Sequence, residues 1–277
     1  MKSLLTAVSF LTRIPVPSLQ ALDAGGVARS SRWFPLVGLL VGLIETAVVY
    51  GLLFLFPASV VAVLTLAVEA LVTGALHFDG LADMADGFGG GTTREQVLRI
   101  MKDHAVGSYG AIALILLIAL KIVALVRLIE LHQVLPYLLV ATVLARWTPV
   151  LQSVWLPYAR VPEEREANQQ KVISEEVNRW DFFLATLLAV AISTTLMGWQ
   201  VLKCWLVILL ISGVVGYLCR RRIGGVTGDT LGANIQLCET AVLLTGTFGS
   251  SSVYPLLGPG AHSRVVASML VLADPLC

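Results

Sequence analysis

Long apolar runs, separated by polar segments of very different length, form the main pattern of this 277-residue chain. A helix needs about 20 predominantly apolar residues to cross the hydrocarbon core of a bilayer. Runs close to this length lie near residues 34–56, 60–77, 109–129, 134–156, 182–200 and 202–219, and a weaker seventh run begins near residue 237. The pattern predicts an all-α, polytopic membrane helix bundle with about six to seven transmembrane helices. We expect residues 1–277 to form a single integral membrane domain.

Composition agrees with a membrane protein and argues against several other classes. Hydrophobic residues make up 57% of the chain, and charged residues make up 13%, against roughly 25% charged residues in soluble domains. Mean hydropathy is +0.83. The net charge of +1 gives no reason to expect nucleic acid as a partner. The four cysteines show no CxxC spacing, which argues against a zinc site or a disulfide framework. The lipid bilayer is the expected partner, and an oligomer is compatible with the sequence.

The polar connections form a long, charged group and a short group that alternate along the chain. The long connections lie at 1–33, 79–108, 157–181 and 220–236, and the short ones near 57–59, 130–133 and 199–203. Most of the 19 Lys and Arg residues lie in the long connections, whereas the short ones contain only Lys203. Positively charged connections tend to stay in the cytoplasm. We therefore expect the long connections on the cytoplasmic side.

Three aspartates gather in the segment "HFDGLADMADGFGGG", residues 77–91. Asp79, Asp83 and Asp86 have the spacing i, i+4, i+7, which places them on one face of a helix, within an arc of about 60°. Carboxylates on one face repel unless a cation lies between them, and hard oxygen ligands suit Mg²⁺ or Mn²⁺. Gly80 leaves room for a large ligand. The alternative is a solvated loop whose acids face water, which the lack of Lys and Arg between residues 77 and 93 makes less favourable.

A second polar segment, "RIMKDHAVGSYG" at residues 99–110, follows in the same connection. Lys102 and Asp103 lie there, and Gly107 and Gly110 begin the next apolar run. A glycine-rich turn that enters a helix can present backbone N–H groups to phosphate. Helix starts are often glycine-rich for no chemical reason, so this segment alone is a weak signal.

A third polar segment, "GGVTGDTLGANIQLCE" at residues 224–239, again combines glycine, threonine and an acid on the cytoplasmic side. We predict that Asp229, with the backbone around Thr227 and Gly228, meets the 77–110 segment across the bundle and completes the site. Both segments lie on the expected cytoplasmic face and interrupt apolar runs with small residues and acids, and each alone has few cations and hydrogen-bond donors. The alternative is a flexible turn whose glycines only reverse the chain.

Charged residues also lie deep inside predicted membrane spans, among them Glu45, Glu69, Lys121 and Arg146. Ionisable side chains in such positions are costly and are functional candidates by default. Glu69 lies ten residues before Asp79 and could support the aspartate cluster. Ion pairs between helices are an equally good explanation for Lys121 and Arg146.

These features support two functions of different class. A phosphotransferase would use metal-bridged carboxylates to hold a nucleotide-linked substrate. A cation-coupled transporter would place its carboxylates near the bilayer midplane, within broken helices and often in inverted repeats. The enzyme is favoured because the aspartates gather at the cytoplasmic rim and the sequence shows no repeat.

Five motifs together resemble the cobalamin synthase family, the adenosylcobinamide-GDP ribazoletransferases. They are "SFLTRIPVP" (9–17), "FPLVGLLVG" (34–42), "HFDGLADMADG" (77–87), "IMKDHAVGSYG" (100–110) and "GGVTGDTLGANIQLCE" (224–239). The resemblance implies a Mg²⁺-dependent, multi-pass enzyme of the bacterial cell inner membrane, with its active site facing the cytoplasm. It implies that the enzyme joins adenosylcobinamide-GDP to α-ribazole, or to α-ribazole 5′-phosphate, and releases GMP in the final nucleotide-loop assembly of cobalamin synthesis. The aspartate pattern is also similar in kind to that of CDP-alcohol phosphotransferases.

The resemblance and the chemistry of the side chains lead to three groups of expected site residues. The expected metal ligands are Asp79, Asp83, Asp86 and Asp229. The expected catalytic residues are Asp83, Asp103 and Lys102, with Asp83 or Asp103 as the base. The expected substrate-binding residues are Arg13, Gly80, Gly107, Gly110, Thr227, Gly228, Asn234 and Glu239.

The chain departs from the family pattern in three places. His104 and Ala105 stand where the family usually has Ser-Arg, so a phosphate contact from that arginine is lost or supplied elsewhere. Gln236 replaces the first of two usual glutamates, and Glu239 keeps the second. Residues 249–277 lie outside the resemblance, and we interpret them as an atypical C-terminal extension.

Overall fold

The computed structural model describes residues 2–16, 24–103, 105–159 and 177–248. Regular structure in these ranges is helical, apart from one isolated parallel bridge between Tyr158 and Val226, so the predicted all-α class is confirmed. The described residues up to Thr247 form one compact unit. The predicted C-terminal extension, residues 249–277, lies outside the described residues, as does His104.

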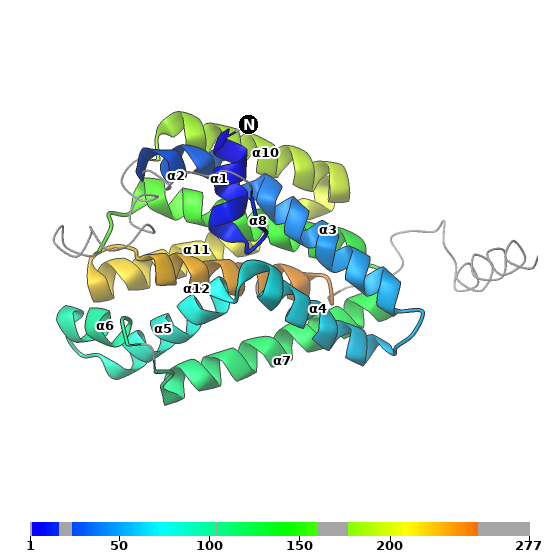
Figure 1. The fold of residues 1–277 in the computed structure, drawn as a ribbon, viewed down its shortest axis with the longest axis horizontal. Helices are drawn as coiled ribbons and strands as arrows, with labels where there is room; N and C mark the ends of the chain where they lie inside the picture. Colours follow the sequence, from blue (N-terminus) through cyan, green and yellow to red (C-terminus); the bar gives the residue numbers. More distant parts are fainter. Residues whose placement is uncertain (1, 17–23, 104, 160–176, 249–277) are drawn as a thin grey trace, which may run out of the picture. The chain divides into compact units, whose positions relative to one another are not determined.

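The helices follow one another in the order shown in Figure 1. Their bounds are α1 Lys2–Leu11, α2 Ala24–Ser30, η1 Ser31–Trp33, α3 Phe34–Leu52, α4 Ala58–Thr73, α5 Leu76–Gly90, α6 Arg94–Ile100, α7 Ser108–Glu130, α8 Val134–Trp155, α10 Arg179–Met197, η4 Gly198–Gln200, α11 Val201–Ile223 and α12 Gly228–Thr245. The α12 helix packs against α5, α7, α8 and α11 and so lies at the centre of the bundle (Figure 1).

Four helical stretches of the described chain are long and apolar enough to cross a membrane, or five if the bent pair α4–α5 counts as one span. The four are Gly26–Leu52, Ser108–Glu130, Val134–Trp155 and Arg179–Ile223. Counted in this way, the structure gives four or five candidate spans, against the six to seven that the sequence predicts. The last stretch contains both α10 and α11, which the sequence predicts as separate spans and which η4 divides.

A sharp bend between α4 and α5 is one reason for the lower number. The apolar run predicted for 60–77 does not continue as one helix, because Gly74 and Ala75 both adopt left-handed backbone conformations, with φ of 65° and 56°. The two helices meet at 92°. Glycine adopts this conformation readily, whereas Ala75 is a non-glycine residue in an uncommon region. The bend starts α5 in a new direction just before the first aspartate.

Close contact between α3 and α8 is a second feature that holds the helix bundle together. A side chain at Gly38 would collide with the backbone carbonyl of Thr142, and one at Gly42 would collide with the Thr142 hydroxyl. Small residues let membrane helices approach closely and gain van der Waals contact. The same helices carry Glu45 and Arg146 into the interior, where both are buried.

Candidate active site at the junction of α5 and α12

The three aspartates of the sequence motif lie on the single helix α5, as their spacing predicts. Asp79 is exposed, Asp83 is partly exposed and Asp86 is buried, so the row runs from the surface into the protein. The carboxylates of Asp79 and Asp83 are therefore those on α5 that a soluble ligand can reach most easily.

The predicted meeting of the 77–110 and 224–239 segments is present in the structure. A side chain added at Gly80 would lie 2.6 Å from the backbone oxygen of Asp229 and 3.1 Å from its Cα. On the next turn of α12, the Cβ position of Gly232 is 3.4 Å from the Cα of His77. The first turn of α12 thus lies directly on the first turns of α5. This contact brings the backbone of Asp229 against α5, within about one helical turn of Asp79 and Asp83.

A reciprocal cap fixes the start of α12. The Thr230 backbone N–H donates to the Thr227 hydroxyl oxygen at 3.3 Å, and the Thr227 N–H donates to the Thr230 hydroxyl oxygen at 2.9 Å. Such a capping box satisfies backbone donors that a helix otherwise leaves without partners. Asp229, in the first turn, accepts a 3.4 Å hydrogen bond from the Thr227 hydroxyl. The cap therefore sets the position of Asp229 beside Gly80.

Asp86 links α5 to the start of α7. Its two carboxylate oxygens accept hydrogen bonds from the backbone N–H groups of Gly107, at 2.7 Å, and Gly110, at 2.9 Å. A side chain at either glycine would collide with this carboxylate. A negative charge at a helix N-terminus is favourable. The glycine N–H groups that the sequence assigns to phosphate therefore donate to Asp86 in this structure.

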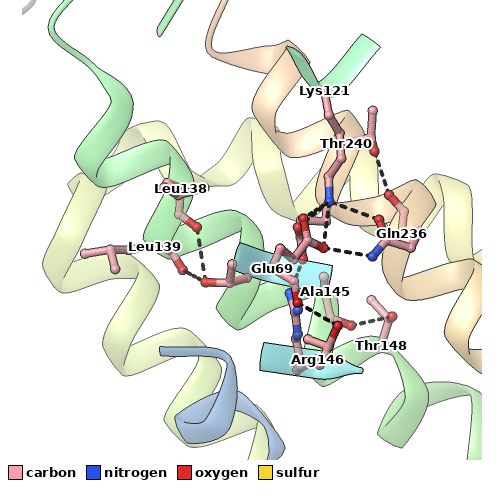
Figure 2. Close-up of polar contacts among 12 residues, drawn as sticks. Glu69, Lys121, Leu138, Leu139, Ala145, Arg146, Thr148, Gln236 and Thr240 are labelled. Atoms are coloured by element: carbon pink, nitrogen blue, oxygen red, sulfur yellow. Dashed lines mark hydrogen bonds and ion pairs between the residues drawn. The ribbon is translucent and has the colours of Figure 1, made fainter. Parts of the chain in front are cut away.

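A buried network of charged and polar groups lies deeper in the bundle, where α4, α7, α8 and α12 meet (Figure 2). The Lys121 Nζ donates to both carboxylate oxygens of Glu69, at 2.9 and 2.8 Å, and to Glu239 at 2.6 Å. Gln236 accepts from Lys121 at 2.9 Å and donates to Glu69 at 2.8 Å. Arg146 pairs with the second oxygen of Glu239. The intramembrane charges thus form ion pairs between helices.

Glu45 adds a third carboxylate to this network. Oxygen atoms of Glu45, Glu69 and Glu239 all lie within 4.8 Å of one another, and this buried triad could hold a metal ion. Among the described residues, the Glu45 Oε1 and the Nε and Nη2 of Arg146 have no hydrogen-bond partner. In the described part of the chain, the cations of this network are Lys121 and Arg146. The three carboxylates therefore exceed the cations by one if all of these groups are ionised.

Comparison with known proteins shows a match to the family model described as cobalamin-5-phosphate synthase, CobS, over residues 3–247. The chain belongs to the CobS family. A protein of Shewanella frigidimarina is 39% identical over 240 residues, covering 86% of this chain and 91% of that protein. A protein of Prosthecochloris aestuarii is 41% identical over 243 residues, covering 86% of this chain and 94% of that protein. Both are named adenosylcobinamide-GDP ribazoletransferase. No solved structure matches the chain.

The structure distributes the remaining expected CobS site residues over two regions. Lys102 and Asp103 are exposed between α6 and α7, where Asp103 accepts a local hydrogen bond of 3.1 Å from the Ala105 N–H. The side chain of Arg13 lies against Gly74, and the Arg13 N–H donates to the Val72 carbonyl at 2.7 Å. Arg13 therefore lies at the bend from which α5 begins.

Asn234 and Glu239 lie in the interior and bond to protein groups. The Asn234 side-chain amide donates to the Ser212 hydroxyl at 3.1 Å, and Glu239 pairs with Lys121 and Arg146. Both residues are buried. The resemblance implies that both bind substrate, and that role stays a prediction. In the structure their contacts hold α12 against its neighbours.

His77 is a residue whose surroundings the sequence does not reveal. It is buried, and neither ring nitrogen has a hydrogen-bond partner among the described residues. It borders a small cavity of about 30 Å³ with Phe34 and Gly228. The apolar run predicted for 60–77 ends at His77, whereas the structure places this residue inside α5, one turn before Gly80.

Gly80→Ala is expected to lower transferase activity at least tenfold, because the added methyl group would push the Asp229 backbone away from α5. Overpacking of this kind typically costs about 1–3 kcal/mol, and a displacement of about 1 Å at a reacting centre can cost on the order of 100-fold in rate. Activity and melting temperature of the purified protein in detergent measure the effect.

Gly90→Ala on the same helix is the matched control, since its Cβ would lie 3.5 Å from the Ile100 side chain, an ordinary contact. Gly90→Ala should behave like the unsubstituted protein. Equal activity in the two variants would contradict a close α5–α12 contact at the site.

Proposed function

We propose that this CobS-family protein joins adenosylcobinamide-GDP to α-ribazole, or to α-ribazole 5′-phosphate, at the junction of α5 and α12 and releases GMP. The relatives named above are ribazoletransferases by name. The observation that carries the assignment to this junction is the packing of Gly80 against the Asp229 backbone, because it joins the aspartates of α5 to the start of α12.

Mg²⁺ fits this junction by the chemistry of its donors. Asp79 and Asp83 on α5 and Asp229 on α12 would hold it, since carboxylate oxygens that leave room for water and substrate phosphate suit this ion. We assign Asp86 a role in positioning α5 and not in binding the metal, because both of its oxygens already accept hydrogen bonds from N–H groups at the start of α7. When bound, Mg²⁺ would neutralise the charge of the diphosphate and so favour in-line displacement.

The buried triad of Glu45, Glu69 and Glu239 fits substrate-linked Mg²⁺ less well. The Lys121 ammonium already bonds to two of its members, and all three side chains are buried. Mg²⁺ in phosphoryl-transfer sites usually keeps several waters and binds substrate phosphates. An exposed or partly exposed aspartate provides that access, whereas a buried glutamate does not.

The reaction forms one bond from a ribazole hydroxyl oxygen to the phosphorus attached to cobinamide and breaks the bond from that phosphorus to GMP. We propose that Asp83 accepts the hydroxyl proton, because this side chain is partly exposed and lies one helical turn from Gly80. Asp103 is the alternative base. A positioned carboxylate of this kind typically supplies about 10²–10⁴-fold in rate.

Cations and a helix N-terminus provide complementary charge for the phosphates. Arg13, at the bend before α5, and Lys102, before α7, are exposed and could approach phosphate oxygens. The N-terminus of α12, at Thr227 and Gly228, carries partial positive charge, which favours anionic groups. These groups would hold the diphosphate while Asp83 takes the proton.

We place the protein in the cell inner membrane with the α5–α12 junction facing the cytoplasm, where nucleotide-linked substrates are made. The basic residues of the long connections support this orientation. A reporter inserted between α7 and α8, at residues 130–133, should then respond as periplasmic. A cytoplasmic response there would reverse the orientation.

Activity should depend on a divalent cation. Purified protein incubated with adenosylcobinamide-GDP and α-ribazole should release GMP and form the joined corrinoid when Mg²⁺ is present. Excess chelator should lower turnover at least 100-fold, and added Mg²⁺ should restore it, because the diphosphate charge is otherwise unscreened. Full turnover in chelator would remove the metal from the proposal, and the lack of any product with Mg²⁺ would remove the proposed reaction.

A further inference from the structure

Three consecutive arginines, Arg220 to Arg222, end helix α11, and they differ in what they contact. Arg220 and Arg221 are exposed, as is typical of basic residues that anchor the end of a membrane span. Arg222 is partly buried, and its Nη2 donates to the backbone oxygens of Phe88 and Gly91, each at 2.6 Å. Its guanidinium also lies over the Phe88 ring, 5.8 Å from the ring centroid. Arg222 therefore joins the end of α11 to the end of α5.

A second arginine makes a connection in the opposite direction. Arg94 is the first residue of α6, which packs against both α5 and α11 (Figure 1). Its Nε donates to the Ile223 backbone oxygen at 2.8 Å, and its Nη2 donates to the Ala159 backbone oxygen at 2.5 Å. Ile223 is the last residue of α11, and Ala159 lies in the short segment after α8. We call Arg94 and Arg222, with their four backbone acceptors, the arginine clamp.

The acceptors of the clamp include groups that need an external donor. The last four carbonyls of a helix have no partner within that helix, and positive charge is favourable beside them. Phe88 lies in the last turn of α5, and Ile223 lies in the last turn of α11. Hydrogen bonds from a guanidinium are stronger than neutral ones, and the planar group fixes their directions. The clamp therefore gives the ends of α5 and α11 a defined separation.

Only a few residues of backbone separate the clamp from both halves of the proposed metal site. On one side, Phe88 follows Asp83 by five residues of continuous helix, about 7.5 Å along the axis. On the other side, the Ala159 N–H donates to the Val226 carbonyl at 2.9 Å, so the segment after α8 is paired with the chain just before α12. Val226 lies three residues before Asp229. The α5 helix and the start of α12 are thus held together at their direct contact and again at the clamp.

We propose that Arg94 and Arg222 are positioning residues, which set the distance between the aspartates of α5 and Asp229 so that both can hold one metal ion. The inference rests on the proposed function and adds to it the part of these two arginines. They act through the backbone, because their donors point at carbonyl oxygens of the protein. A residue that only anchored the span could be replaced by lysine, whereas a guanidinium that donates to two carbonyls in fixed directions could not.

Arg222→Lys tests the clamp, because it keeps the positive charge and removes the planar donor group. The turnover number for GMP release should fall at least tenfold, since a displacement of about 1 Å at a reacting centre can cost on the order of 100-fold. Mn²⁺ affinity, measured by electron paramagnetic resonance, should fall at least threefold. Arg221→Lys is the matched control, because it makes the same change at the exposed neighbouring position. It should alter neither quantity, and equal behaviour of the two variants would overturn the inference.

Hydrogen exchange of the purified protein, measured by mass spectrometry, follows the clamp without any substrate. In Arg222→Lys, amides at the end of α5 and in the first turn of α12 should exchange at least tenfold faster, because both would open locally more often. Amides of α3 and α8 should keep their rates, and Arg221→Lys should match the unsubstituted protein. Unchanged exchange at α5 and α12 would overturn the inference. Faster exchange throughout the bundle would also overturn it, because it would show a general loss of stability.

A double variant separates positioning from an independent effect on the metal. If Arg222 acts through the position of Asp229, the losses of Mn²⁺ affinity in Arg222→Lys and Asp229→Asn should combine to less than their product. A full product would show independent action and overturn the inference. If Mn²⁺ binding responds as expected but the unsubstituted protein forms no joined corrinoid, the proposed reaction fails and the clamp stands. Normal turnover in Arg222→Lys would overturn the clamp and leave the proposed reaction intact.

Discussion

Asp83→Asn is expected to lower ribazoletransferase turnover at least 100-fold while the protein still inserts and folds. The substitution keeps the shape of the side chain and removes its negative charge. In the proposed mechanism that charge both binds Mg²⁺ and accepts the hydroxyl proton, and loss of a positioned base alone costs about 10²–10⁴-fold. Asp83 is only partly buried, so the effect on stability should be small. Steady-state release of GMP, normalised to the amount of folded protein, measures the change.

Glu95→Gln is the control for Asp83→Asn. Glu95 is an exposed acid in the first turn of α6, which packs against α5. The Glu95→Gln substitution removes one negative charge from the same region without changing the junction of α5 and α12. Turnover should stay within about twofold of normal, because single surface charges contribute little. If Asp83→Asn retains more than half of normal turnover, Asp83 is an ordinary solvated acid and the mechanism loses its base.

Among the variants proposed for this protein, Lys121→Met is expected to lower the free energy of unfolding most. The ammonium bonds to Glu69, Glu239 and Gln236, and its removal leaves carboxylates buried with too little positive charge. Breaking a buried ion pair on one side typically costs about 3–5 kcal/mol. For a protein of this size that loss corresponds to a fall of roughly 10 °C in melting temperature. Thermal unfolding in detergent, followed by circular dichroism, measures the shift.

Arg127→Met, on the same helix, is the matched control for Lys121→Met. Arg127 pairs with Glu130 at 3.3 Å, but the two side chains are 50% and 54% exposed, and exposed pairs contribute little. The melting temperature should not change measurably. The double variant Lys121→Met with Glu69→Gln should recover part of the loss, because it removes one of the uncompensated carboxylates. Equal melting temperatures for Lys121→Met and Arg127→Met would show that the network does not stabilise the bundle.

The sequence predicts the aspartate row and its meeting with Asp229 because both depend on simple rules. Helical spacing places Asp79, Asp83 and Asp86 on one face. The 77–110 and 224–239 segments both interrupt apolar runs and are expected on the same side of the membrane. This topology predicts that they meet, as they do at Gly80. The assignment of chemical roles within this junction goes beyond such rules.

The partners of Asp86 could not be predicted in the same way. Its hydrogen bonds go to residues 21 and 24 positions later, and they depend on how α7 packs against α5. The glycines at 107 and 110 look like a phosphate-binding turn, but in the structure they make room for a carboxylate of the same chain. A pattern of small residues before a helix does not say which anion approaches it.

The bend between α4 and α5 could not be predicted, because hydropathy does not record backbone direction. The residues across the bend at Gly74 and Ala75 remain apolar, so the run at 60–77 appears continuous. The start of α12 is polar, and the sequence therefore places the seventh run near 237, although the helix begins at Gly228. Asn234 and Gln236 are buried there because Ser212 and Glu69 are their partners. Side-chain pairs between distant helices are not visible in a hydropathy pattern.

Binding of Mn²⁺, a paramagnetic substitute for Mg²⁺ at oxygen sites, tests most directly the claim that α5 and α12 form one metal-dependent centre. Electron paramagnetic resonance of the purified protein would give the affinity for the unsubstituted chain, Asp83→Asn, Asp229→Asn and Glu45→Gln. We predict at least tenfold weaker Mn²⁺ binding in both aspartate variants and unchanged binding in Glu45→Gln. Unchanged affinity in Asp83→Asn and Asp229→Asn, with weakened binding in Glu45→Gln, would contradict the account and move the metal to the buried glutamates.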